Sequence, residues 1–497
     1  MKKNHIIAAL VLMMLPVMAG AQVLKGSYFL DNSVNAHKLN PAFSPRANYF
    51  QLTPIGNLGF GVYTNLDMGT FLYPLDNGKL GTFLHPEVSL KKFDKELPKH
   101  PHFDMDFNTN ILSFGFYTKN QAFWNFTLDS RVMADVDLPR DLFIFMKKGT
   151  GMGEESFNVG NFNMYMTAGV QASLGYSREF VKNLRTGVKV RVIAPLAYFG
   201  LNLESVRLNT SQEKWAIQTE GYAYAAMQGF GTTESENSTP DAESAMPSVA
   251  FDMNKMMANS VLAGMGYSFD LGARYILEIG SIIDGLTVSA SVTDLGQIFY
   301  KKEAVTSFET SGNMEWTGLN NIDLGLDLDA DDITQDLMDD AKDLANLSEA
   351  TEGKKLVRST MPRFYLGVEM PFLKRKMSVG LLYSSRLSHS YARNELTVSY
   401  NLKPTKGFAL GLNYSFLNTG GTMGAILEFT PKVGPAFYIG CDYFPARYAA
   451  LPLAESMIPM LQNIPIPKSL RMNLNFGFSF NMGSKHVNPK KEKKIKE

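Results

Sequence analysis

Long segments in which apolar and polar side chains alternate constrain the fold of this chain most. Between Phe408 and Phe416 every second residue is large and apolar, and the residues between them are small or polar. Residues 286–293 and 471–481 repeat the pattern, and residues 164–176 extend it further. Successive side chains of a strand point to opposite faces, so each segment is predicted to be a strand with one apolar face.

The length of these segments and the chemistry of their second face separate two fold classes. Strands of soluble sandwiches usually run about 5–6 residues, whereas many segments here run about 9–13 residues, as a tilted strand needs to cross a bilayer. The second face carries small residues and charges, which include Asp129, Arg131, Lys189, Arg191, Arg363, Glu369 and Glu428. This alternation indicates lipid outside and a polar lumen inside. The alternative is a large soluble β-sandwich, because each barrel strand gives only a weak signal.

The predicted fold is therefore all-β, a transmembrane antiparallel β-barrel of about 14 strands (12–16) with short helices in the outer loops. The count rises to about 16 if Pro195 divides one strand into two, and is about 14 if residues 199–225 form a hairpin beyond the membrane. The candidate strands are 48–63, 106–117, 121–131, 162–177, 184–195, 199–209, 213–225, 258–275, 285–300, 362–371, 376–387, 393–402, 407–417, 423–430, 436–444 and 470–482.

Short and long connections alternate, as in outer-membrane barrels with short periplasmic turns and long outer loops. The short turns carry Lys or Arg, and the longer connections are 132–161, 226–259, 301–361 and 445–469. Helical signals within the longer connections predict helices over 137–149, 247–262, 331–347 and 454–464.

Both ends of the chain indicate export and a periplasmic location. Lys2 and Lys3 precede an apolar run and the cleavage sequence Ala19-Gly20-Ala21, which together predict a signal peptide over 1–21, cleaved near Ala21. The expected organisation is then a periplasmic or lumen segment over 22–46, an outer-membrane barrel over 47–483 and a basic periplasmic tail over 484–497. The tail is expected to be solvated, with a partner contact as the alternative. The predicted location is the cell outer membrane.

Composition and motifs exclude several functions. Lys+Arg and Asp+Glu both number 48, so the basic footprint of a nucleic-acid-binding protein is missing. Cys441 is the single cysteine, and alternation places it on the face of Phe437, Ile439 and Tyr443. No nucleophile elbow, P-loop or zinc-protease motif occurs, so we predict that the protein is not an enzyme and has no cofactor or metal site. The acidic stretch 323–343 is read as a solvated loop, with structural calcium as the alternative.

An elbow precedes the first predicted strand. Leu39-Asn40-Pro41-Ala42-Phe43 is followed by Pro45, and two prolines four residues apart make the segment stiff and non-helical. Such an elbow can tuck into a barrel lumen, in which case Asn40, Pro41, Ala42 and Phe43 form a lumen hatch. A simple periplasmic turn into the first strand is the other interpretation.

The order of several short segments resembles an uncharacterised Bacteroidota family of outer-membrane barrels, related to FadL-like and PorV/PorP-like barrels. The matching segments are Leu39–Phe43, Leu138–Phe145, Gly175–Arg178 and Ser291–Gly296. The resemblance implies either a transporter or channel for small hydrophobic molecules, or a non-transporting scaffold in type IX secretion, gliding or envelope assembly. The expected partners are outer-membrane lipid, a hydrophobic small molecule, and periplasmic or secretion-system proteins.

Overall fold

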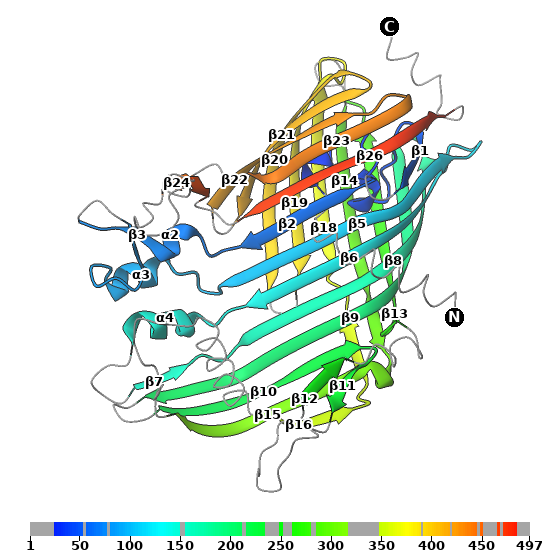
Figure 1. Cartoon of the computed structure of the whole chain (residues 1–497). Helices are drawn as coiled ribbons and strands as arrows, with labels where there is room; N and C mark the ends of the chain where they lie inside the picture. The colour runs from blue at the N-terminus through cyan, green and yellow to red at the C-terminus, as the bar shows by residue number, and fades with distance from the viewer. Residues whose placement is uncertain are drawn as a thin grey trace.

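Fourteen strands of the described chain close into one antiparallel barrel (Figure 1). This computed structural model describes residues 24–484, except for 53–55, 77–79, 150–154, 211–214, 234–247, 252–260, 280–284, 317–346, 389–390, 418–419, 445–447, 451–464 and 468–470. β1 (Asn48–Leu52) and β2 (Leu58–Thr64) share one place in the wall, because both pair with β5 and with β26. The pairing with β26 closes the barrel, so the predicted fold is confirmed.

The other wall strands pair with their neighbours in chain order. They are β5 (His102–Tyr117), β6 (Phe123–Asp137), β8 (Phe162–Val181), β9 (Leu184–Thr210), β13 (Gly264–Leu277), β14 (Leu286–Tyr300), β18 (Arg363–Phe372), β19 (Met377–Leu387), β20 (Ala392–Thr405), β21 (Phe408–Leu417), β22 (Gly420–Phe429), β23 (Val433–Phe444) and β26 (Met472–Gly483).

The two faces of the wall differ as the alternation predicts. On β26, Phe478 is 38 % exposed while its neighbour Ser479 is 4 % exposed. The predicted inward charges are buried, Lys189 and Glu428 among them, except for Arg131, which is half-buried. An apolar outer belt around a polar interior is the arrangement of an outer-membrane barrel. None of the described helices is long and apolar enough to span a membrane.

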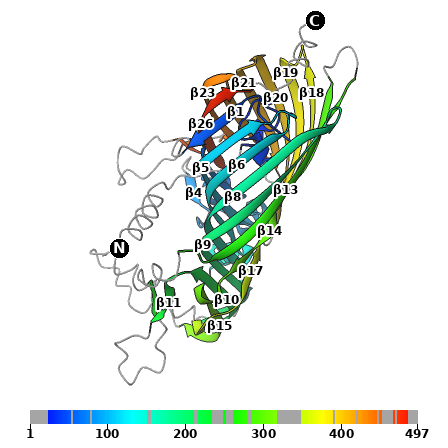
Figure 2. The same ribbon diagram turned by 90° about the vertical axis from the view of Figure 1, so that its right-hand side faces the viewer.

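Residues 199–225 extend the sheet beyond the barrel. Pro195 does not end β9, whose first half pairs with β13 and whose second half pairs with β10 (Trp215–Met227). β10 in turn pairs with β15 (Val305–Trp316), and β15 with β16 (Leu347–Glu352). This extension lies at the lower end of the molecule in Figure 2, and it accounts for the count of fourteen rather than sixteen.

The sequence predicts a loop over the connection 301–361, but its described residues contain three strands. Besides β15 and β16 it holds β17 (Leu356–Ser359), which continues the wall by pairing with the end of β14. Further short pieces are η3 (Lys302–Ala304), β7 (Glu155–Asn158), and the pairs β11 (Phe230–Thr233) with β12 (Ser248–Phe251) and β24 (Tyr448–Ala450) with β25 (Pro465–Pro467).

One of the four predicted helices is confirmed. α4 (Arg140–Lys148) follows Pro139 and ends at Gly149, whose φ of 66° suits glycine. It packs with α2 (Met68–Phe71), α3 (Leu90–Glu96) and the hairpin β3 (Leu72–Pro74)–β4 (Leu80–Thr82) in a lobe at the barrel end, on the left of Figure 1. The prediction over 247–262 is wrong at its start, where residues 248–251 form β12. Residues 252–260, 317–346 and 451–464 lie outside the described residues, as do the predicted signal peptide and most of the tail.

Two bulges turn extra side chains inward. In β14 the register shifts beside Asp294, whose φ is 59°, and both Thr293 and Asp294 are buried. In β23 the register with β22 shifts after Cys441, so that Asp442 and Tyr443 are both buried. The prediction that Tyr443 shares the face of Cys441 is therefore wrong, because a bulge adds one residue to the alternation.

Candidate functional site: the lumen plug and its cavities

Residues 24–46 form a plug inside the barrel. Two single 3₁₀ turns, η1 (Lys25–Ser27) and η2 (Ala36–Lys38), are joined by backbone turns. In Figure 1 the plug is the dark blue segment within the barrel, near the end where the C-terminus lies. Leu39 is 1 % exposed, and Asn40 and Ala42 are fully buried. The plug therefore makes the lumen at this end a packed core.

The four residues of the predicted hatch lie together against β9, β13 and β14. The Asn40 Nδ2 atom donates to the carbonyl oxygens of Ala273 at 3.4 Å and Ala290 at 3.3 Å, and its Oδ1 accepts from the Ala42 N–H at 2.9 Å. The Ser291 hydroxyl donates to the Leu39 carbonyl at 2.7 Å. Phe43 packs edge-on against Tyr28, with ring centroids 4.9 Å apart.

Glycines in the wall make room for this elbow. A Cβ atom on Gly187 would lie 2.1 Å from the Pro41 carbonyl oxygen, and one on Gly272 would lie 2.1 Å from Asn40 Oδ1. Gly380 likewise faces the Phe29 ring. The plug backbone thus approaches the wall more closely than any side chain there would permit.

Charged groups hold the first half of the plug. The backbone N–H groups of Lys25 and Gly26 donate to the Asp442 carboxylate at 2.7 and 2.8 Å. Lys25 Nζ pairs with Glu395 and donates to the Tyr443 hydroxyl at 2.5 Å. Burial lowers the pKa of Lys25, and the Glu395 carboxylate opposes that shift. The β23 bulge supplies both Asp442 and Tyr443, so it builds this anchor.

The second half of the plug is held around His37. Lys189 Nζ lies 3.0 Å from both the carbonyl oxygen and Nδ1 of His37, and His37 Nε2 lies 2.8 Å from the Tyr49 hydroxyl. Burial, reinforced by Lys189, lowers the pKa of His37 well below its usual value. A neutral imidazole can accept at Nδ1 from the lysine, which has donors only. Lys38 pairs with Asp129 at 3.0 Å.

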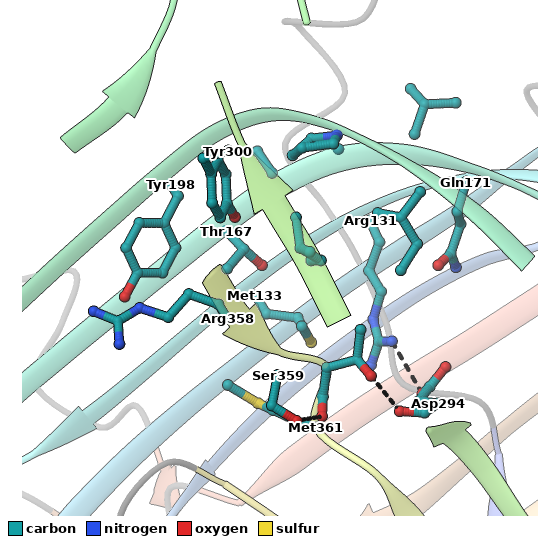
Figure 3. Close-up of a pocket in the computed structure, with 17 residues that line it drawn as sticks. Arg131, Met133, Thr167, Gln171, Tyr198, Asp294, Tyr300, Arg358, Ser359 and Met361 are labelled. Atoms are coloured by element: carbon teal, nitrogen blue, oxygen red, sulfur yellow. Dashed lines mark hydrogen bonds and ion pairs between the residues drawn. The ribbon is translucent and has the colours of Figure 1, made fainter. Parts of the chain in front are cut away.

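A network of ion pairs crosses the lumen beside the plug. Asp106 pairs with Arg131 at 3.0 Å and with Arg363 at 2.7 Å. Arg131 also reaches Asp294 at 3.2 Å, as Figure 3 shows. Arg191 joins the network through Asp294 and through Asp270, the latter at 2.8 Å. Buried charges of both signs that pair in this way bring strands from across the barrel together.

An apolar cavity lies on one side of the network (Figure 3), and its empty space, including the part that is open to solvent, is about 690 Å³. β8 from Met166 to Ala172 is half-exposed on both faces, so the wall here is not packed against a filled core. Arg131 and Asp294 line one edge of the cavity, and Arg358, Tyr198 and Tyr300 line another. The apolar lining includes Met133, Val170, Ile193, Pro195, Ile298 and Met361.

A second, polar cavity lies between the network and the plug, and its empty space, including the part that is open to solvent, is about 520 Å³. It shares Arg131, Gln171 and Asp294 with the apolar cavity, and it reaches Lys38 and Leu39 of the plug. The apolar cavity, the ion-pair network and the plug therefore follow one another through the lumen.

Sequence reasoning found the lumen charges and the plug elbow but not the cavity. Tyr300 is the last residue of a predicted strand, whereas Arg358 lies in the predicted loop over 301–361. The signal that could have located the cavity is Pro195, because β8 and β9 shift register at Gly169 and Pro195. Within the described residues, no group of three or more His, Cys, Asp or Glu side chains could hold a metal ion.

Comparison with protein families identifies the chain. A family of unknown function, DUF5723, matches residues 41–442. The chain belongs to this family. It has no match among curated proteins. The resemblance to an uncharacterised family is thus confirmed.

Solved structures with a similar fold include toluene transporters. The Pseudomonas putida toluene transporter TodX is 11 % identical, covers 90 % of this chain and 94 % of its own, and gives a TM-score of 0.36. The Ralstonia pickettii toluene transporter TbuX is 7 % identical, covers 93 % of this chain and 95 % of its own, and gives a TM-score of 0.36.

Proposed function

We propose that this DUF5723 protein is an outer-membrane channel for small hydrophobic molecules, with the plug as its hatch. The observation that carries the proposal is the apolar cavity within an otherwise charged lumen. Sites for small ligands are mostly apolar cavities with a few polar groups that orient the ligand. Burying an apolar ligand is favourable by about 25 cal/mol per Å² of apolar surface.

The plug suits the role of a hatch because residues 24–46 fill the lumen without joining the sheet of the wall. Its elbow rests on the Asn40 and Ser291 hydrogen bonds, and its first half on Asp442 and Glu395. Each contact can be broken without unpairing a barrel strand. Movement of residues 24–46 would join the polar cavity to the barrel end where the plug lies.

Uptake by intact cells tests the proposal. The probe is N-phenyl-1-naphthylamine, a neutral hydrophobe that fluoresces on entering the membrane, added to cells that express the full chain or lack it. Thr167 lines the cavity, so Thr167→Trp should fill it and reduce uptake to that of the deletion strain. Thr167→Val, which keeps the volume, should retain uptake.

Heat-modifiable gel migration of both variants verifies that the barrel has folded. Undiminished uptake by a folded Thr167→Trp variant would overturn the channel. If such uptake were accompanied by a stoichiometric protein partner on purification, a scaffold role would replace it.

A further inference from the structure

Arg358 lines the apolar cavity, and no carboxylate of the described residues pairs with it. β17 places it directly opposite Ile298 of β14. Among the described residues no Asp or Glu forms an ion pair with it, and its Nε atom is buried without an acceptor. Arg131, Arg191 and Arg363, by contrast, each face two carboxylates of the network. The positive charge of Arg358 is therefore available to a ligand.

Tyrosine rings surround this guanidinium. Its central carbon lies 5.4 Å from the Tyr198 ring centroid and 5.5 Å from that of Tyr224. Tyr198 in turn lies 5.3 Å from Tyr300, which lines the same cavity. Figure 3 shows Arg358 beside Tyr198, with Tyr300 next along the wall. Aromatic rings leave the donors on the edge of a guanidinium for a ligand, because they interact through its face.

This geometry fits one ligand chemistry. The edge of a guanidinium matches a carboxylate in a bidentate arrangement, and such a pair strengthens where water is excluded. Tyr198 and Tyr300 offer offset or edge-on contacts to a further ring, which aliphatic chains do not use. Ile298 and Met361 supply apolar contact around them. The cavity thus offers a cation for a carboxylate and rings for an aromatic body.

We propose that the cavity binds aryl carboxylates, with the carboxylate on Arg358 and the ring against Tyr198 and Tyr300. This inference rests on the proposed channel and names the class of molecule that it carries. The ion-pair network at the opposite edge is already neutralised, so it competes little for the ligand anion.

Equilibrium binding to the purified full chain in mild detergent tests the inference. The probes are 2-naphthoate, the uncharged 2-naphthylmethanol of similar size, and the aliphatic decanoate. Wild type should bind 2-naphthoate at least about tenfold more tightly than either of the others, since hydrogen bonds to charged groups are the stronger ones.

Variants at the cavity assign the effect to its residues. Arg358→Gln should remove the preference for 2-naphthoate over 2-naphthylmethanol, and Arg358→Lys should keep only part of it. Lys354→Gln is the matched control, because it removes a cation that pairs with Glu309 outside the cavity. Tyr198→Leu should reduce the preference for 2-naphthoate over decanoate.

The failures of the two proposals are distinguishable. Equal binding of 2-naphthoate by wild type and a folded Arg358→Gln variant would overturn the inference while leaving a channel for neutral molecules. A preference of wild type for decanoate would overturn the aromatic part. If neither wild type nor Thr167→Trp bound any of the three probes, the cavity would not be a binding site. That result would also contradict the proposed channel.

Discussion

Adding one methyl group at Gly187 should unseat the plug. The Cβ of Gly187→Ala would lie 2.1 Å from the Pro41 carbonyl oxygen and 2.6 Å from the Ala42 nitrogen, where ordinary contact begins at 3.4 Å. Both neighbours are backbone atoms, so no rotamer change relieves the overlap. The elbow must retreat from β9 by about an ångström, because the wall strand is fixed by pairing on both sides.

The cost follows from the contacts that this retreat stretches. The Asn40 bonds to Ala273 and Ala290 are already 3.4 and 3.3 Å long, and the Ser291 bond to Leu39 is 2.7 Å. Three hydrogen bonds of about 0.5–1.5 kcal/mol each give a loss of about 2–4 kcal/mol. The population with the plug unseated should therefore rise roughly 30- to 1,000-fold.

Single-channel conductance in planar bilayers measures this population. Gly187→Ala should spend a larger fraction of time in conducting states than wild type, and Gly272→Ala should behave alike. Gly407→Ala is the control, since its Cβ would meet Pro431 at an ordinary 3.4 Å near the same barrel end. Conductance of Gly187→Ala equal to that of this control would refute the steric account of the seated plug.

Three further predictions concern the anchor, the titration of the plug and the lipid face. Asp442→Asn should destabilise the seated plug by about 1–2 kcal/mol, because the Lys25 and Gly26 N–H groups lose a charged acceptor. The open fraction in conductance recordings measures this loss, with Asp94→Asn in the exposed lobe as control. An open fraction of Asp442→Asn equal to that of wild type contradicts the prediction. Burial lowers the pKa of His37 from 6.5, so an unseated, hydrated His37 binds more protons than a seated one. The seated plug should therefore become less stable as pH falls below about 6.5, and His37→Gln should lose that dependence. An open fraction of wild type that is equal at pH 5 and pH 8 argues against this account. Phe478→Arg should cost about 2–4 kcal/mol of barrel stability if the residue lies near the bilayer midplane; heat-modifiable migration tests it against Phe478→Leu, and normal assembly of the arginine variant disproves the assignment of faces.

The wall strands could be predicted because their signal is local. Alternation along Phe408–Phe416 or Arg471–Asn481 reports the two environments of a single strand, without reference to any partner. The same logic fails at Asp294 and Tyr443, because a bulge depends on how two strands pair, and one inserted residue inverts every later assignment. Pro195 misleads for a related reason. Its missing N–H suggests that a strand ends there, whereas β9 continues through Pro195 and changes its partner from β13 to β10.

The helix prediction over 247–262 fails in a different way. Residues 248–251 pair with β11, and such a short apolar stretch suits either a helix or a strand until a partner is present. The hairpin of residues 199–225 shows the converse. Its length and alternation equal those of a wall strand, and only its pairing with β15 places it beyond the barrel.

The sequence alone predicted an all-β membrane barrel with an apolar outside, a charged inside and a stiff elbow ahead of the first strand. Those properties depend on side-chain alternation and on proline, which act over a few residues. Tertiary structure decided that the elbow seats on Gly187 and Gly272, and that three arginines and three aspartates form one network. It also decided that Arg358 lies among tyrosines, with no carboxylate partner in the described part of the chain. These contacts join residues far apart in the chain, such as Asn40 and Ala290, so their geometry exists only once the barrel has closed.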